Sequence, residues 1–265
     1  MGKLKFYSYS LFKVKKISFT EKDVNDIVQM MKEAKYIVAF TGAGISTESG
    51  LSDFRGKDGI WTRKEKGLPP KRGKHFDEVK PNTGHLAFVA LQEMGILKFL
   101  ISQNVDNLHL KSGIKPEMLA ELHGNYMFMK CIECDSRFKR EDIGWDREIH
   151  GSGFRTEEQL DHQPVCLECQ GRIISSVVNF NDPMPDQEMT ISKKHTEKCD
   201  LMLVVGSSLS VFPAAGLPRK AQRNGVKLII INIDSTPLDE KADIKLEVSA
   251  GEILSQVVAK LQENN

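Results

Sequence analysis

TGAGISTESGLSDFRG, residues 41–56, directly follows the apolar run YIVAF at residues 36–40. An apolar run that ends in a glycine-rich loop is typical of a buried strand leading to a phosphate. The loop nevertheless fits neither common pattern of phosphate binding. Thr47 stands where the dinucleotide pattern G-x-G-x-x-G needs its third glycine, and the G-K-[ST] of a P-loop is absent.

Around this loop, apolar runs alternate with amphipathic segments. The pattern predicts helices over 21–34, 82–96, 214–225 and 250–262, and strands over 35–40, 97–106, 175–180, 199–209 and 226–234. This alternation indicates the α/β class, with a parallel sheet covered by helices on both faces. Ligands of such sheets bind at the carboxyl ends of the strands, which here include TGAG, QNVD, GSS and NID. These small and polar residues favour a nucleotide-like ligand.

The composition excludes some classes of protein. Among the 265 residues, 37 lysines and arginines oppose 36 acidic residues, which gives a formal net charge of +1. A near-neutral chain has no global field for nucleic acid or for an anionic membrane, so only a local basic patch would bind either one. No apolar run approaches the roughly 20 residues of a membrane span, so no membrane partner is expected.

Residues 1–20 form a basic arm with five lysines and no acidic residue. We predict that the arm pairs as an edge strand, with a targeting signal as the alternative. Myristoylation is disfavoured because Phe6 stands where a Ser or Thr is needed. With no secretory signal and an odd number of cysteines, the chain is expected inside the cell, in the cytoplasm or the nucleus. The lysines also leave nucleic acid or chromatin as a candidate partner.

Four of the five cysteines form two C-x-x-C pairs, Cys131 with Cys134 and Cys166 with Cys169, separated by 31 residues. Two such turns complete a tetrahedral zinc site of four thiolates, with chance or redox pairs as the alternative. Because protein fills all four positions, one structural zinc per chain is expected. We predict a small zinc-binding module over 126–172, inserted into a larger domain of 21–125 and 173–265. Cys199 is predicted to be inert core.

The glycine loop indicates how a diphosphate would bind. The backbone N–H groups of Gly42, Ala43 and Gly44 could line it, with an ordinary tight turn as the alternative. Arg55 could bind phosphate or ribose. Asp53 could orient Arg55 or an amide, unless the two residues form only a surface pair.

Further polar residues follow the second predicted strand. Gln103, Asn104 and Asp106 suit ribose hydroxyls or a carboxamide. His123 lies in ELHGN, just before the predicted zinc-binding module. A lone histidine is more often structural, but one between the sheet and the insert is a candidate base.

Several motifs occur in one order: TGAGISTESGLSDFRG, SQNVDNLH, LHGN, the two C-x-x-C pairs, VVGSSLSVFPAAGLP and LIIINID. Together they resemble the sirtuins, the NAD-dependent protein lysine deacylases, from about Val24 to Leu261. The stretches DFRGKDGIWTRKEKGLPP and LAELHGN are most similar to the class IV branch. The resemblance implies a large Rossmann-like domain and a small zinc domain, with NAD and acyl-lysine meeting between them.

The resemblance also implies roles for individual residues. Phe54 would shield the reactive ribose carbon, Gln103 would contact that ribose, and Asn104 and Asp106 would accept the nicotinamide. His123 would be the catalytic general base. The further contacts with NAD would come from Gly42, Ala43, Gly44, Thr47, Asp53, Arg55, Trp61, Gly206, Ser207, Ser208, Asn232, Asp234 and Ala250.

In the mechanism that the resemblance implies, the acyl oxygen attacks the anomeric carbon of the ribose as nicotinamide leaves. His123 then activates a ribose hydroxyl, and water completes the release of O-acyl-ADP-ribose and deacylated lysine. Such a site holds two reactants in line and uses a histidine that titrates near neutrality. NAD is therefore expected as a co-substrate, and an acyl-lysine protein or peptide as the partner.

The chain departs from the family just after the predicted substrate-binding residues Val178, Asn179 and Phe180. Most sirtuins have F-G-E here, whereas Asn181 and Asp182 follow Phe180 in this chain. Asparagine tolerates a positive φ and aspartate keeps the charge, so the fold is expected to survive while acyl preference and turnover differ.

Other functions remain open. Acetyl and long-chain acyl groups are both candidate substrates. Mono-ADP-ribosyl transfer would use the same NAD site, and a non-catalytic NAD-sensing protein with a zinc ribbon would not need His123 as a base. An oxidoreductase is disfavoured, because the glycine spacing is wrong and no acidic ribose partner is evident about 20 residues further on.

Overall fold

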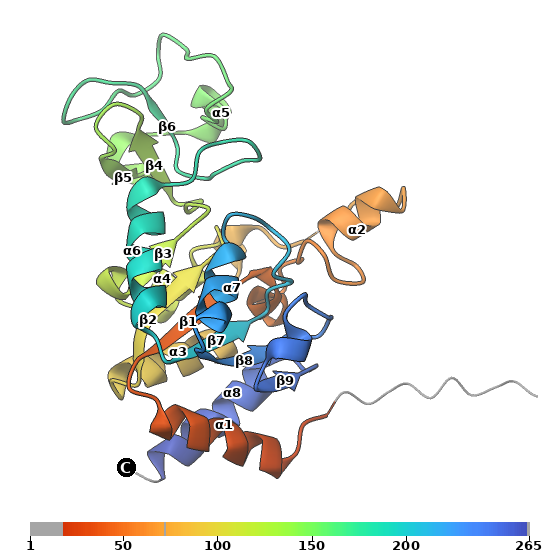
Figure 1. Cartoon of the computed structure of the whole chain (residues 1–265). Coiled ribbons are helices and arrows are strands. Elements are labelled where there is room, and N and C mark those ends of the chain that lie inside the picture. Colours follow the sequence, from red (N-terminus) through yellow and green to blue (C-terminus); the bar gives the residue numbers. More distant parts are fainter. Residues whose placement is uncertain (1–17, 72, 264–265) are drawn as a thin grey trace, which may run out of the picture.

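The computed structural model describes residues 18–71 and 73–263, and its main feature is a six-stranded parallel sheet (Figure 1). The strands of this sheet are β1 (Ile37–Thr41), β2 (Leu97–Ser102), β3 (Leu119–Glu121), β7 (Leu201–Val205), β8 (Lys227–Ile231) and β9 (Ile244–Leu246). Their order is β3-β2-β1-β7-β8-β9, and every pairing is parallel. This is the dinucleotide-binding order, in which the order of the strands reverses between β1 and β7 and leaves a ligand crevice there. The predicted Rossmann-like fold class is confirmed.

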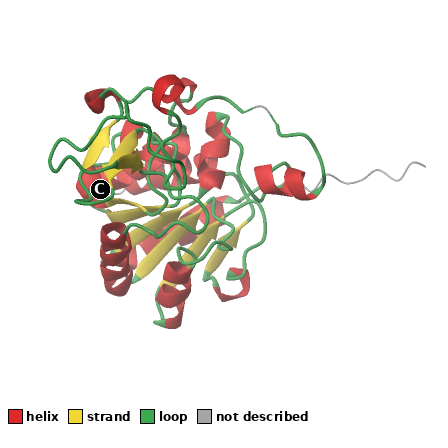
Figure 2. Ribbon diagram, turned by 90° about the horizontal axis from the view of Figure 1, so that it is seen from above, coloured by secondary structure: helices red, strands yellow, loops and turns green. Residues whose placement is uncertain are grey.

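Helices cover both faces of the sheet (Figure 2), because successive side chains of each strand point to opposite sides. On one face, Ile37 and Ala39 of β1 belong to the core formed with α1 (Glu21–Glu33), α3 (Thr83–Glu93) and α8 (Ala250–Gln262). On the other face, Val38 and Phe40 belong to the core that includes α7 (Gly216–Arg223), with α6 (Asp186–Lys198) at its edge.

The start of α1 illustrates how the local sequence sets an element. The Thr20 hydroxyl accepts a hydrogen bond from the backbone N–H of Asp23, and the Asp23 carboxylate accepts one from the N–H of Thr20. This reciprocal cap satisfies N–H groups that a helix start leaves unpaired. Four apolar residues at helical spacing then bury one face of the helix: Val24, Ile27, Val28 and Met31.

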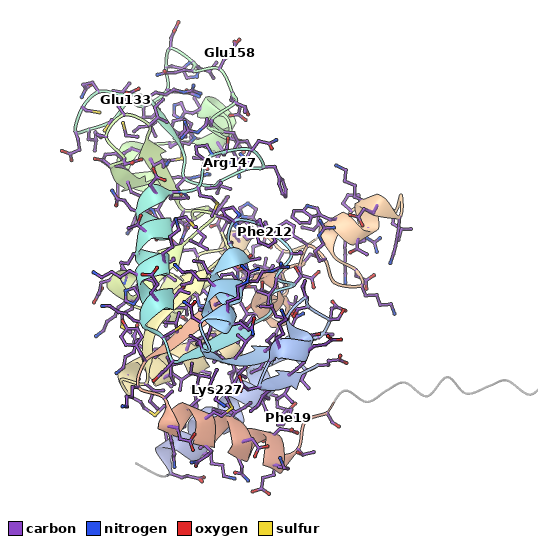
Figure 3. All side chains as sticks on the ribbon, viewed as in Figure 1. Phe19, Glu133, Arg147, Glu158, Phe212 and Lys227 are labelled. Atoms are coloured by element: carbon purple, nitrogen blue, oxygen red, sulfur yellow. The ribbon has the colours of Figure 1, made fainter. Side chains whose placement is uncertain are left out.

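A second, antiparallel sheet of three strands contains β4 (Phe128–Cys131), β5 (Arg137–Lys139) and β6 (Ile173–Ser175). In Figure 3, Glu133 and Glu158 of this region lie at the opposite end of the molecule from Lys227, where β8 begins. The small sheet therefore lies beyond the carboxyl ends of the main strands. The domain boundaries remain a prediction, and the pairing of β6 with β4 carries this sheet three residues past position 172.

The structure differs from the sequence prediction in a few elements. The strand predicted over 175–180 is wrong: β6 ends at Ser175, and the extended residues after it do not join the main sheet. Instead, the N–H of Val178 donates to the carbonyl of His123 at 2.9 Å. The short edge strands β3 and β9 and the helix α6 were not predicted. The edge strand predicted for the basic arm falls mostly on residues 1–17, outside the described residues. No helix in the described ranges has the length and apolar character to cross a membrane.

Candidate functional site

Two loops meet at the crevice between β1 and β7. The N–H of Gly42 donates to the carbonyl of Val205 at 3.1 Å, and the N–H of Gly44 donates to that of Gly206 at 2.8 Å. A Cβ atom at Gly44 would lie 2.7 Å from the Cα of Gly206, so no side chain fits there. Two of the three N–H groups expected to line a diphosphate thus bind the neighbouring loop. These two glycines allow the two loops to approach each other closely.

Below the glycine loop, three buried side chains form a hydrogen-bond network. The hydroxyl of Ser46, in the 3-10 helix η1 (Ala43–Ser49), donates to Asp106 Oδ2 at 2.7 Å and accepts from Asn104 Nδ2 at 3.3 Å. Burial raises the pKa of Asp106, while the hydrogen bonds from Ser46 and the N–H of Leu108 act in the opposite direction. Sequence reasoning missed Ser46, whose only signal was its place in the hydroxyl-rich loop.

The amide oxygen of Asn104 marks a place for a ligand. Asn104 Oδ1 is buried and has no hydrogen-bond partner among residues 18–71 and 73–263. A buried acceptor left without a donor costs about 1–3 kcal/mol, so such atoms are usually satisfied by a ligand or by water. A carboxamide N–H matches this acceptor, which agrees with the expected nicotinamide pocket at Asn104 and Asp106.

His123 is held by the backbone at the end of β2. Its Nδ1 lies 2.8 Å from the carbonyl oxygen of Gln103. A carbonyl oxygen only accepts, so the proton sits on Nδ1 and the lone pair on Nε2 remains available. Burial lowers the pKa of His123, and the hydrogen bond to Gln103 partly offsets this effect. The ring is therefore neutral near pH 7, in the form that takes up a proton.

The loop that carries His123 is fixed by the chain after β6. Gly124 has a φ of 73°, and a Cβ atom there would lie 1.8 Å from the carbonyl oxygen of Ser176. The Ser176 hydroxyl donates to the carbonyl of Asn125 at 2.7 Å, and Val178 pairs with His123 as described above. This close packing brings Val178, the first predicted substrate-binding residue, next to the candidate base.

The loop after η1 is ordered differently from the expectation for Asp53 and Arg55. Asp53 Oδ1 accepts from the N–H of Gly56 at 3.0 Å, so the carboxylate stabilises the turn that follows. Arg55 instead forms an ion pair with Glu65 at 2.9 Å and lies over the ring of Trp61 at 4.5 Å. The roles of Asp53 and Arg55 toward NAD remain a prediction.

Three aromatic rings connect this loop to the predicted substrate-binding residues. The ring centroids of Phe54 and Trp61 are 4.9 Å apart, and those of Trp61 and Phe180 are 5.1 Å apart. Phe54 is 40% exposed and Phe180 is 68% exposed, so both ends of this row of rings are open to solvent. The row therefore presents an apolar surface beside the crevice.

The residues that replace the usual Gly and Glu form a closed turn. Asn181 has a φ of 70°, in the left-handed region that glycine would adopt. The Asp182 carboxylate accepts from the N–H of Asn179 at 3.0 Å, and the N–H of Asp182 donates back to the Asn179 carbonyl at 3.1 Å. These contacts favour the expectation that the fold tolerates this departure, which stays a prediction.

The remaining predicted NAD contacts lie at the carboxyl ends of β1, β7 and β8 and at the start of α8. Gln103 Nε2 donates to the Ser207 hydroxyl at 2.7 Å, which links the ends of β2 and β7. Glu48 accepts from the N–H of Gly251 at 3.0 Å and so ties η1 to the start of α8. The other predicted NAD contacts in these regions are Thr47, Gly206, Ser208, Asn232, Asp234 and Ala250.

Local hydrogen bonds hold several of this group. Thr47 Oγ1 donates to the carbonyl of Gly44 at 2.8 Å, Asn232 Nδ2 donates to that of Asp234 at 2.7 Å, and the Ser208 and Ser210 hydroxyls lie 2.7 Å apart. The structure thus brings the predicted residues to one edge of the sheet. Their contacts with NAD remain a prediction.

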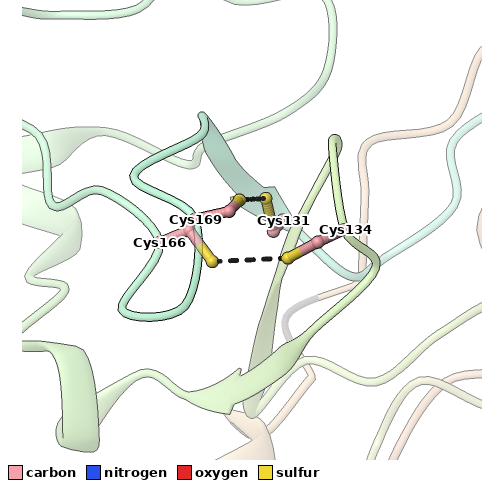
Figure 4. Close-up of side chains that lie close together, drawn as sticks. All are labelled: Cys131, Cys134, Cys166 and Cys169. Carbon is pink, nitrogen blue, oxygen red and sulfur yellow. Dashed lines mark hydrogen bonds between the residues drawn. The ribbon is translucent and has the colours of Figure 1, made fainter.

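The four paired cysteines converge in the small sheet (Figure 4). Their sulfurs lie within 4.8 Å of one another, with 3.5 Å between Cys131 and Cys169 and 3.6 Å between Cys134 and Cys166. A tetrahedral site with Zn–S bonds of about 2.3 Å places its sulfurs about 3.8 Å apart, so the cluster fits zinc. The four cysteines are positioned to hold one zinc ion. Because four thiolates leave no coordination position for water or substrate, the set agrees with a structural ion.

Comparison with known proteins defines the class. A model of the Sir2 family matches residues 42–70 and 69–213. A protein of Thermodesulfovibrio yellowstonii named NAD-dependent protein deacetylase is 37% identical, with 91% of this chain and 96% of that protein covered. A solved Sir2 structure with a p53 peptide and NAD+ has a TM-score of 0.70 at 30% identity, covering 89% of this chain and 98% of that one.

The chain therefore belongs to the Sir2 family, and the resemblance to the sirtuins is confirmed. Relatives differ in length. NAD-dependent protein deacetylase SRT1 of Arabidopsis thaliana is 36% identical over 90% of this chain. The chain spans about half of that relative, 49% of its length.

Proposed function

We propose that this chain is an NAD-dependent protein lysine deacylase that releases nicotinamide and O-acyl-ADP-ribose. The observation that carries the proposal is the hydrogen bond from His123 Nδ1 to the Gln103 carbonyl, which leaves Nε2 as a proton acceptor. That acceptor lies on a loop paired with Val178. A neutral histidine at the junction of a dinucleotide crevice and a peptide-binding stretch is what the reaction requires.

NAD supplies an activated ribose carbon whose bond to nicotinamide breaks. Asn104 and Asp106 would hold the carboxamide, with Asn104 Oδ1 accepting from its N–H. Phe54 would exclude water from the ribose carbon, and Gln103 would position the ribose. His123 would take the proton from a ribose hydroxyl at Nε2. The remaining contacts would be those predicted from the sequence, from Gly42 to Ala250.

The domain boundaries and the substrate-binding residues are part of the proposal. Residues 21–125 and 173–265 would form the NAD-binding domain, and 126–172 the zinc-binding module. Val178, Asn179 and Phe180 would bind the acyl-lysine peptide, as supported by the pairing of Val178 with His123. The class IV branch, a location in cytoplasm or nucleus, and a nucleic-acid or chromatin partner stay hypotheses.

Two alternative functions use the same site. Mono-ADP-ribosyl transfer would consume NAD without needing an acylated lysine. A non-catalytic NAD sensor would bind NAD without breaking it, and the prepared tautomer of His123 argues against it.

The test is to incubate the protein with NAD and with acetyl-lysine, myristoyl-lysine or unmodified peptides. We expect nicotinamide and O-acyl-ADP-ribose with at least one acylated peptide, and loss of both products in His123→Ala. Nicotinamide release with the unmodified peptide alone would favour ADP-ribosyl transfer. If neither product forms with any peptide, the proposal is wrong.

A further inference from the structure

Residues 62–75, TRKEKGLPPKRGKH, concentrate positive charge, and we call them the basic segment. The segment holds six cations and one acidic residue, whereas the other 251 residues hold 31 cations and 35 acidic residues. It includes most of α2 (Ile60–Glu65), which projects from the body of the molecule in Figure 1. A nearly neutral chain thus carries a strong local excess of positive charge at one projection.

Most of these cations have no counter-charge in the part of the chain that the structure describes. The Arg63 guanidinium lies 3.6 Å from the Asp58 carboxylate. By contrast, four exposed lysines form no ion pair with any described residue: Lys64, Lys66, Lys71 and Lys74. Like charges at this density repel one another, so an anionic partner would relieve the repulsion as well as bind.

The basic segment lies against the candidate site. A Cβ atom on Gly50, which ends η1, would meet the Lys74 side chain at 3.3 Å. Burial raises the pKa of Asp53, and the nearby charge of Lys71 acts in the opposite direction. Trp61, the residue before the segment, packs on Phe180 at 5.1 Å. Lys64 lies three residues after Trp61 in α2, on the same side of the helix. A peptide lying along Val178 to Phe180 would therefore pass close to Lys64, Lys71 and Lys74.

We propose that the basic segment selects acyl-lysine substrates with acidic residues beside the modified lysine. This inference rests on the proposed deacylase function and narrows its substrate class. The charge distribution favours an acidic peptide over nucleic acid. Outside the basic segment and the arm of residues 1–20, the chain has 26 cations and 35 acidic residues. A nucleic acid would need a positive surface that continues from the segment along its phosphate backbone, and this charge distribution predicts none. The few carboxylates of an acidic peptide need only the local charge of the segment.

The test uses two acetyl-lysine peptides of equal length, with either Glu or Gln at the two positions on each side of the acetyl-lysine. At about 20 mM salt we expect kcat/KM to be about fivefold higher for the Glu peptide, as two or three exposed charge pairs allow. At about 300 mM salt the preference should largely disappear, because screening shortens the range of these interactions.

The variant Lys64→Glu with Lys66→Glu should reverse the preference at low salt. The control is Lys193→Glu with Lys194→Glu, at two exposed positions in α6. This control changes the net charge by the same amount and should keep the preference for the Glu peptide. Equal kcat/KM for the two peptides would overturn the inference. The inference would also be overturned if Lys64→Glu with Lys66→Glu raised the KM for NAD by the same factor with both peptides. The segment would then serve to bind the cofactor.

Nucleic acid is tested in parallel with a labelled DNA duplex. If the unmodified protein binds the duplex more tightly than Lys64→Glu with Lys66→Glu, while neither protein distinguishes the peptides, the inference is wrong in favour of nucleic acid. Turnover of the Gln peptide shows that the deacylase function stands even when the inference fails. Turnover of neither peptide would overturn the function itself, and the inference with it.

Discussion

Two buried histidines, His85 and His109, lie next to each other near the end of β1. Their ring centroids are 5.0 Å apart, and His109 Nε2 lies 2.9 Å from the Thr41 hydroxyl. His85 is fully buried, and burial lowers its pKa to about 4. Burial lowers the pKa of His109 as well. Both rings are therefore neutral in the folded protein at neutral pH.

This arrangement predicts a loss of stability in acid. In the unfolded chain His85 takes up a proton below about pH 6.5, but in the folded protein only below about pH 4. The free energy of unfolding should therefore fall by about 3 kcal/mol between these pH values because of His85 alone. Urea unfolding across this range should show a shallower pH dependence for His85→Gln than for the exposed control His162→Gln. The same slope in both variants would contradict this coupling.

Asn181 gives a second prediction for a single residue. Its φ of 70° costs a residue with an ordinary Cβ about 1 kcal/mol, whereas glycine adopts this conformation freely. Asn181→Gly should thus leave the melting temperature nearly unchanged, and Asn181→Ala should lower the unfolding free energy by about 1 kcal/mol. An Ala variant as stable as the Gly variant would show that the left-handed backbone is not what limits this position.

At the scale of elements, an ion pair between a buried carboxylate and a partly exposed arginine joins the small sheet to the loop of His123. The Arg137 guanidinium of β5 lies 2.5 Å from Glu121 Oε2 at the end of β3, and it packs over the ring of Phe128 at 4.0 Å. The other oxygen of Glu121 accepts from Asn125 Nδ2. Because Glu121 is 5% exposed, its charge depends on these partners.

Arg137→Met should therefore destabilise the protein by about 2 kcal/mol, less than for a fully buried pair because Arg137 is partly exposed. In Arg137→Met, kcat should fall by a larger factor than KM changes, because the loop that carries His123 loses a contact that holds it in place. Glu121→Gln combined with Arg137→Met should regain most of the stability, because no unpaired charge remains. Urea unfolding and steady-state kinetics measure both effects. A double variant no more stable than Arg137→Met would refute the role of the pair.

The zinc cluster gives the other prediction for elements. Cys131→Ala should lose the one zinc ion per chain expected by elemental analysis, and the fluorescence of Trp145, which packs beside Cys131 and Cys166, should change. Cys199→Ala is the matched control, because Cys199 is buried in a different core. If Cys131→Ala keeps its zinc and its stability, the structural role of the cluster is disproved.

The central elements were predictable because each is a buried apolar run or a strongly amphipathic helix. β3 and β9 were not, since three residues at a sheet edge carry no clear periodicity. The run SSVVNF has the composition of a strand, yet its backbone pairs with the loop of His123 rather than with the main sheet. Such a pairing depends on a glycine, Gly124, that allows two segments far apart in sequence to touch.

The sequence could predict which residues gather at this edge of the sheet, but not the contacts between them. Motif order placed His123, Asn104 and the four cysteines in the right regions. Ser46 was missed because its role comes from Asp106, sixty residues later in the chain. Likewise, the hydrogen bonds that Gly42 and Gly44 donate depend on the pairing of β1 with β7, two strands far apart in the sequence. The local sequence around the glycines does not predict this pairing.

At the scale of the whole molecule, the architecture brings three parts to one edge of the main sheet. These parts are the dinucleotide crevice between β1 and β7, the loop of His123, and the aromatic row that ends at Phe180. The small sheet with its cysteine cluster lies beyond the same edge (Figure 1). In the proposed reaction, these parts would together hold two reactants, NAD and the acyl-lysine.

The stoichiometry of the products tests the coupling of these two reactants most directly. With acylated peptide and NAD, mass spectrometry should find nicotinamide, deacylated lysine and O-acyl-ADP-ribose in equal amounts, and His123→Ala should form no O-acyl-ADP-ribose. Free acid in place of O-acyl-ADP-ribose, or nicotinamide formed without deacylated lysine, would contradict the account.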